Sequence, residues 1–143
     1  MMLSTITKLF LFIFILKINL LYAQPISHIN IKLPHSHKSL KVIIANTDKL
    51  RQIGLMNIKN MQNNVGMLFV FDEIDNHCFW MKNTYIPLSI AFLDENKIIV
   101  DIQDMKELDE TPHCSLNKVK YALEVKQGFF KVNKLGINTK LNF

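Results

Sequence analysis

Residues 77–94 read HCFWMKNTYIPLSIAFLD and divide into two apolar runs around a polar turn. HCFWMK and IPLSIAFLD are short and rich in aromatic and branched residues, which favours strands, and NTY carries turn-forming residues. Successive side chains of a strand point to opposite faces, so Cys78, Trp80 and Lys82 share one face and the residues between them share the other. The stretch therefore predicts a strand, a tight turn and a second strand.

Similar runs flank this stretch on both sides. GMLFVF (66–71) precedes it, and KIIVDI (97–102) and VKYALEVK (119–126) follow it. Nearer the start, SHINIKL (27–33) and LKVIIA (40–45) predict an opening hairpin. No helix of four turns separates the runs, which argues against a parallel βαβ sheet. We therefore expect a mainly β protein of the β-rich α+β class, a compact antiparallel β-sandwich or barrel with one or two short helices.

Two short helices complete this prediction. NTDKLRQIG has a capping residue at its start and a glycine at its end, which predicts a helix from Asp48 to Ile53 with Gly54 as its C-cap. FFKVNKLG predicts a second short helix, which ends at Gly136.

The first residues, MMLSTITKLFLFIFILKINLLYAQP, have the layout of a secretory signal peptide: a basic Lys8, an apolar run and a small Ala23. Lys17 interrupts the apolar stretch, which is shorter than the roughly 20 residues that a membrane-spanning helix needs. We expect residues 1–23 to be a signal peptide and 24–143 to be a single β-rich domain, periplasmic or secreted. An uncleaved membrane anchor is the alternative.

The charge balance bears on the partners. The chain has 17 basic and 12 acidic residues, and removing the signal peptide takes two lysines, which leaves a net charge of +3 (15 minus 12). Such a small excess of positive charge does not indicate nucleic-acid binding, and no nucleic acid is expected as a partner. Peripheral contact with an anionic envelope surface is compatible with it, and the oligomeric state has no signal in the sequence.

The polar turn indicates a candidate ligand-binding site. Trp80, Lys82, Asn83 and Thr84 place an indole, a cation, an amide and a hydroxyl together, a combination that can hold an anionic or sugar-like small ligand. The purely structural alternative puts Trp80 in the core and Lys82 in solvent, while Asn83 and Thr84 satisfy the turn. The sequence leaves both interpretations open.

Two further charged residues belong to this hypothesis. Glu124 alternates with apolar neighbours in YALEV, which predicts the solvent face of a half-buried strand, or a partner for Lys82 or Arg51. The candidate ligand-binding residues are Arg51, Trp80, Lys82, Asn83, Thr84 and Glu124.

The familiar catalytic signatures G-x-S-x-G, H-E-x-x-H, C-x-x-C and a phosphate-binding glycine loop are missing. We therefore favour a non-enzymatic module of the cell envelope that binds a small ligand or an envelope component, with no cofactor and no metal. The competing hypothesis is an envelope enzyme in which Lys82 or Thr84 reacts and Glu124 or Asp94 supplies the base.

A second alternative is copper handling. His35 and His37 lie on the same side of an extended segment, and the mature chain is rich in methionine. The methionines lack a tight repeated spacing, so core filling is the favoured role for most of them.

Cys78 and Cys114 are the only cysteines, and a pair in an exported chain favours a disulfide. Such a bond would be worth about 3 kcal/mol. Free thiols are the main alternative. A Cys2His2 metal site is disfavoured, because His77 and Cys78 face opposite ways on a strand.

Four ordered motifs resemble the bacterial and archaeal family called domain of unknown function 192, also known as uncharacterised protein family 0127. They are GLM, GMLFVF, FWMKNTYIPLSIAFLD and YALEVKQGFF, and they extend over nearly all of the mature chain. The resemblance implies a small, mainly β domain of sandwich or barrel type, often exported, with no established activity, substrate or cofactor.

The chain both shares and lacks features of that family. Its two His-Cys dipeptides look like those of one branch. Many relatives carry Arg where this chain has Ile58 and Asp where it has Ser89. A reaction that needed either charge in those relatives would not carry over to this chain.

Overall fold

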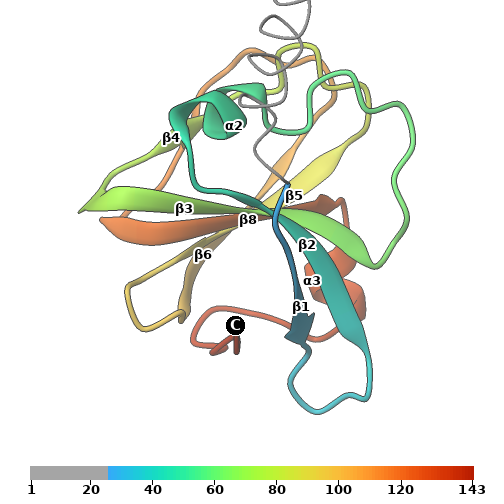
Figure 1. The fold of residues 1–143 in the computed structure, drawn as a ribbon, viewed down its shortest axis with the longest axis vertical. Helices are drawn as coiled ribbons and strands as arrows, with labels where there is room; N and C mark the ends of the chain where they lie inside the picture. The colour runs from blue at the N-terminus through green and yellow to red at the C-terminus, as the bar shows by residue number, and fades with distance from the viewer. Residues whose placement is uncertain (1–25) are drawn as a thin grey trace, which may run out of the picture.

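The computed structural model describes residues 26–143, so the expected signal peptide lies outside the described residues. A six-stranded sheet has the order β1-β2-β3-β8-β5-β6, and a separate ribbon pairs β4 with β7 (Figure 1). The strands are β1 (His28–Lys32), β2 (Ser39–Ala45), β3 (Val65–Asp75), β4 (Cys78–Phe79), β5 (Leu88–Leu93), β6 (Ile99–Met105), β7 (His113–Cys114) and β8 (Val119–Lys126). The helices are α2 (Asp48–Ile53) and α3 (Phe129–Val132).

The expected mainly β fold with two short helices is confirmed. The large sheet is mixed rather than wholly antiparallel, because β2 and β3 pair in parallel. Residues 46–64, which include α2, form the crossover that a parallel pair needs. Within the described residues the sheet does not close into a barrel, although the C-terminal segment forms isolated bridges with Lys32 and Ile98 near its two edges.

The local predictions succeed to different degrees. β1 and β2 form the expected antiparallel hairpin. Helix α2 has the predicted bounds, with the Thr47 hydroxyl accepting a hydrogen bond from the Leu50 N–H and Gly54 as the C-cap. Helix α3 is shorter than predicted: it ends at Val132 with Asn133 as its C-cap, and residues 133–134 form a turn before Gly136. Within residues 26–143 no helix has both the length and the apolar character needed to cross a bilayer.

The sheet is covered on both faces. α3 and the C-terminal segment pack against one face, and α2 with the β4–β7 ribbon lies over the other (Figure 1). All six residues of β5 are buried, as are residues 122–125 of β8. Alternation along these central strands therefore separates two cores, rather than a core from solvent.

Gly66 of β3 lies directly opposite Val125 of β8 and has no room for a side chain. A Cβ atom there would come within 2.6 Å of the Glu124 carbonyl oxygen and 2.9 Å of Val125 Cγ1. We expect Gly66→Ala to lower the free energy of unfolding by about 1–3 kcal/mol, because a strand has to move to admit the methyl group. Urea denaturation measures the change.

Gly136→Ala is the matched control for this substitution. Nothing lies within 4 Å of a Cβ atom at Gly136. The control should stay within about 0.5 kcal/mol of the wild type. If Gly66→Ala changed the free energy of unfolding as little as Gly136→Ala does, β3 and β8 would not be in close contact at Gly66.

Candidate functional site

A cavity of about 230 Å³ lies between α2, the β4 segment and the sheet. We call it the Glu124 cavity. Residues 51–56 line it from α2 and the turn after it, and residues 77–80 line it from the β4 segment. The other lining residues are Phe69, Phe71, Thr84 and Glu124.

Glu124 is the acidic residue of this lining. It lies on β8 between Met67 of β3 and Ile90 of β5, so neighbouring strands enclose it on both sides. Its residue exposure is 5%. Burial alone raises the pKa of its carboxyl group from 4.5 to about 8, so the carboxyl group is mostly protonated at neutral pH.

The prediction that Glu124 faces solvent is wrong. Glu124 shares its face of β8 with Ala122, which packs in the core beneath α2 and the ribbon, while Leu123 and Val125 pack in the other core. Among the hydrogen bonds and ion pairs of the described residues, none joins the Glu124 carboxyl group to Lys82 or Arg51.

Arg51 lines the cavity from α2, and protein groups already engage its guanidinium. It donates hydrogen bonds to the Val70 carbonyl at 2.7 Å, to Asp48 at 2.5 Å and to Asp72 at 2.8 Å. The hydrogen bond to Asp48 is the main cause of its raised pKa. Arg51 therefore anchors α2 to β3, and two carboxylates balance its charge.

His77 is a lining residue that the sequence-based hypothesis missed. Its ring stacks on Phe71 with 3.5 Å between centroids, and its Nε2 atom is buried with no hydrogen-bond partner. Burial lowers the pKa of the imidazole, which favours the neutral form. The available signal was the alternation that puts His77 and Trp80 on opposite faces, although a metal ligand was the only role that the sequence suggested for His77.

Trp80 and Lys82 are both exposed, so they share one face as the alternation of the stretch predicted, and the structure shows that this face is the outward one. Trp80 is 49% exposed and lines the cavity, so the structural interpretation that placed it in the core is wrong. Strand β4 ends at Phe79, before either residue. Lys82 Nζ lies 5.0 Å from the Trp80 ring centroid, but Lys82 is not among the lining residues.

Asn83 and Thr84 form the turn after this segment. Asn83 has a left-handed φ of 55°, and its carbonyl accepts a hydrogen bond from the Asn57 N–H at 2.8 Å. Thr84 is buried and lines the cavity. Of the six candidate residues, the structure brings four together at the cavity, namely Arg51, Trp80, Thr84 and Glu124, and leaves Lys82 and Asn83 outside its lining.

A disulfide joins Cys78 to Cys114, as the sequence favoured. The two residues are directly opposite each other in the β4–β7 ribbon. Because His77 and Phe79 flank Cys78, the disulfide fixes the segment that contributes both rings to the cavity.

The residues of the alternative hypotheses lie elsewhere. Asp94 accepts hydrogen bonds from two backbone N–H groups of the β5–β6 turn, so only Thr84 and Glu124 of the enzyme hypothesis share the cavity. His35 and His37 are exposed in the β1–β2 turn. In the described residues, no three His, Cys, Asp or Glu side chains are grouped to hold a metal ion. Met61, Met67, Met81 and Met105 are buried.

The two positions at which many relatives carry a charge are also outside the cavity lining. Ser89 donates a hydrogen bond to Asp104 at 2.5 Å and accepts one from the Gly128 N–H at 3.1 Å. Ile58 is partly exposed. The chemistry of the Glu124 cavity therefore does not depend on either departure.

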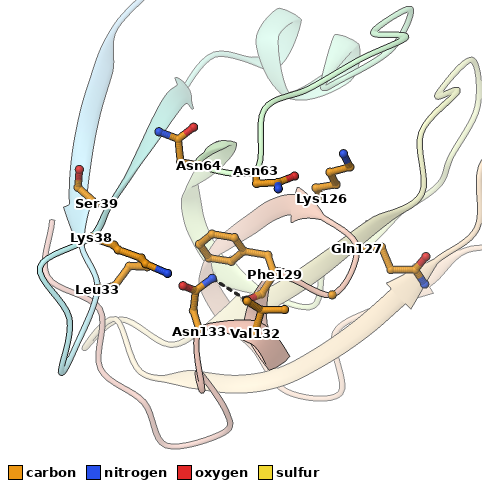
Figure 2. Close-up of a pocket in the computed structure, with 11 residues that line it drawn as sticks. Leu33, Lys38, Ser39, Asn63, Asn64, Lys126, Gln127, Phe129, Val132 and Asn133 are labelled. Carbon is orange, nitrogen blue, oxygen red and sulfur yellow. Dashed lines mark hydrogen bonds between the residues drawn. The ribbon is translucent and has the colours of Figure 1, made fainter.

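A larger cavity of about 400 Å³ lies beside α3. In Figure 2, Lys38 and Lys126 stand on opposite sides of the Phe129 ring, and Asn133 donates a hydrogen bond to the Phe129 carbonyl. Its lining contains no acidic residue and no buried titratable group. We take the Glu124 cavity as the candidate site because it has such a group.

An open mixed sheet, with a two-stranded ribbon over a cavity that buries one glutamate, defines a small β-rich α+β protein. The family model DUF192 (Uncharacterized ACR) matches residues 30–143, so the chain belongs to the domain of unknown function 192 family. The family resemblance noted from the sequence motifs is thereby confirmed. No curated protein gives a significant match.

Two solved structures share the fold. One is a Sinorhizobium meliloti 1021 protein, proposed in its description to be a transcription regulator; it is 28% identical, with a TM-score of 0.75 over 83% of this chain and 97% of that chain. The other is a protein of unknown function from Novosphingobium aromaticivorans DSM 12444; it is 22% identical, with a TM-score of 0.77 over 85% of this chain and 89% of that chain.

Proposed function

We propose that this protein is a non-enzymatic binding module of the cell envelope that takes a small ligand into the Glu124 cavity. The supporting observation is a carboxyl group buried on a central strand, at a cavity, with no charged partner among residues 26–143 to offset its burial. Burying a carboxyl group is unfavourable unless another group satisfies it. A ligand that enters the cavity can supply the missing partner.

The lining supports this proposal. His77 contributes a buried Nε2 atom that has no hydrogen-bond partner among residues 26–143, and four aromatic rings are part of the lining. A volume of about 230 Å³ is below the range of roughly 300–1,000 Å³ that drug-sized ligands occupy. The ligand is therefore a small molecule, or one end of a larger envelope component.

Export is part of the proposal. The N-terminal sequence has the layout of a signal peptide, and a disulfide persists best in an oxidising compartment. A periplasmic or secreted protein would meet small molecules and envelope components rather than nucleic acid.

Trp80 makes the binding proposal measurable. It is the only tryptophan of the chain and it lines the cavity, so its fluorescence reports occupancy. In a screen of small charged and neutral metabolites, we expect a saturable change in Trp80 emission and no consumption of the ligand by NMR.

Two variants separate cavity binding from contact with the exposed side of the ring. Glu124→Gln should weaken the response, whereas Lys82→Met should preserve it, because Lys82 lies over the ring and is not a lining residue. Chemical conversion of the ligand would support the competing enzyme hypothesis with Thr84 and Glu124. No saturable response to any ligand class would contradict the binding function.

A further inference from the structure

We propose that the Glu124 cavity is selective for a cation and binds the ammonium group of a small amine against the Glu124 carboxylate. This inference rests on the proposed function, since it names the ligand class of the same cavity.

The burial of Glu124 determines which charge its cavity favours in a ligand. Glu124 is the acidic residue of the lining, and Met67 and Ile90 flank it on the neighbouring strands. A carboxylate in such surroundings is stable only when an opposite charge reaches it. An ammonium group brings that charge together with three hydrogen-bond donors.

The cavity also has aromatic residues in its lining. Phe69, Phe71, Phe79 and Trp80 line the cavity around the carboxyl group. The faces of such rings attract cations within about 6 Å of the centroid. An anionic ligand would gain no such attraction from aromatic rings and would meet a second negative charge, and a neutral ligand would gain hydrogen bonds alone.

Two other titratable groups, Arg51 and His77, line the cavity. Arg51 approaches it from α2, but Asp48 and Asp72 bind its guanidinium, and the three side chains together carry one negative charge. His77 approaches from the β4 segment, and burial favours its neutral form. Among the described lining residues no unbalanced cation is available for Glu124, so the ligand has to supply one.

Amine binding at Glu124 should depend on pH, because it is coupled to the loss of a proton from the carboxyl group. The ammonium group binds the carboxylate, whereas the empty cavity holds a carboxyl group with a pKa of about 8. Binding must therefore release a proton. Affinity should rise about tenfold per pH unit below pH 8 and level off above it.

The test compares three four-carbon ligands of similar shape: n-butylammonium, n-butanol and butyrate. The probe is the indole N–H signal of Trp80 in a two-dimensional NMR spectrum. We expect n-butylammonium to shift this signal saturably, with an affinity about ten times higher at pH 7 than at pH 6. The other two ligands should bind at least about tenfold more weakly, which corresponds to the loss of one favourable charge contact.

Variants assign the effect to the carboxyl group. Glu124→Gln should weaken n-butylammonium binding at least about tenfold and remove its pH dependence, with folding checked by thermal melting. Lys82→Met should retain both the affinity and the pH dependence.

The outcomes separate the two proposals. Butanol or butyrate binding as tightly as n-butylammonium would overturn the cation selectivity and leave the binding function standing. A Trp80 signal that responds to none of the three would also overturn the cation selectivity, and the wider fluorescence screen then decides the binding function by itself.

Discussion

Replacing Glu124 with glutamine should remove a large pH dependence of stability between about pH 4.5 and pH 8. The carboxyl pKa is about 8 in the folded protein and 4.5 for an unperturbed side chain. The folded state therefore binds the proton more tightly than the unfolded state does. The stabilising effect of this proton binding is complete below pH 4.5 and is lost as the pH rises through 8. The contribution of Glu124 to the free energy of unfolding should fall by about 5 kcal/mol across this range.

Urea denaturation of both proteins from pH 4 to pH 9 measures this contribution. Glutamine keeps the shape of the side chain and stays neutral, so the variant should lack the decline. His77 acts in the opposite direction, because burial lowers its pKa and its stabilising effect is lost as the pH falls. The difference between wild type and variant, rather than the wild-type curve alone, therefore isolates Glu124.

A matched substitution at an exposed glutamate serves as the control. Glu95 lies in the turn between β5 and β6 and is exposed. Glu95→Gln should give a curve parallel to that of the wild type. If the curve of stability against pH for Glu124→Gln were also parallel to the wild-type curve, the Glu124 carboxyl group would not be buried in the way that the structure describes.

Reducing the disulfide between Cys78 and Cys114 should lower the free energy of unfolding by about 3 kcal/mol. The bond closes a loop between residues 36 positions apart in the sequence, and reduction returns that loop's freedom to the unfolded chain. Strands β4 and β7 have only two residues each, and besides the bond and their pairing, hydrogen bonds between residues 76–77 and Ser115 join the two segments. The cavity should therefore become less ordered when the bond is lost.

The double variant Cys78→Ser, Cys114→Ser provides the measurement. Both cysteines are exposed, so serine buries no new hydroxyl group. Urea denaturation should show the loss of stability, and the Trp80 emission of the folded protein should shift toward that of a hydrated indole. Added reductant should destabilise the wild type and leave the double variant unchanged. Equal stability of the wild type before and after complete reduction would contradict a structural role for the bond.

Much of the fold could be predicted because its signals are local. The bounds of α2 follow from a capping threonine at one end and a glycine at the other. The opening hairpin follows from two alternating runs around a turn. The parallel pairing of β2 with β3 could not be predicted in this way, because it depends on where the crossover returns the chain to the sheet.

The site was less predictable because burial depends on segments distant in sequence. Glu124 alternates with apolar residues, which indicates a solvent face only when one side of the sheet is open. Here α2 and the ribbon cover that side, and β8 is a central strand. The nearly continuous apolar run around Glu124 was a usable signal, since such runs are typical of strands buried on both faces.

Trp80 illustrates the same limit. The alternation of residues 77–82 correctly separated two faces, but it did not show which face would be inward. The structure turns Phe79 and Met81 inward and leaves Trp80 half exposed at the cavity. That choice depends on the sheet beneath, which is contributed by β3 and β8.

A carbon-13 NMR titration of the Glu124 carboxyl group, from pH 4 to pH 10 with and without saturating n-butylammonium, tests this account most directly. The account expects a midpoint near pH 8 in the empty protein, since burial raises the pKa to about 8, and a clearly lower midpoint when the amine is bound. A midpoint near pH 4.5 in the empty protein, or one that the amine does not move, would contradict it.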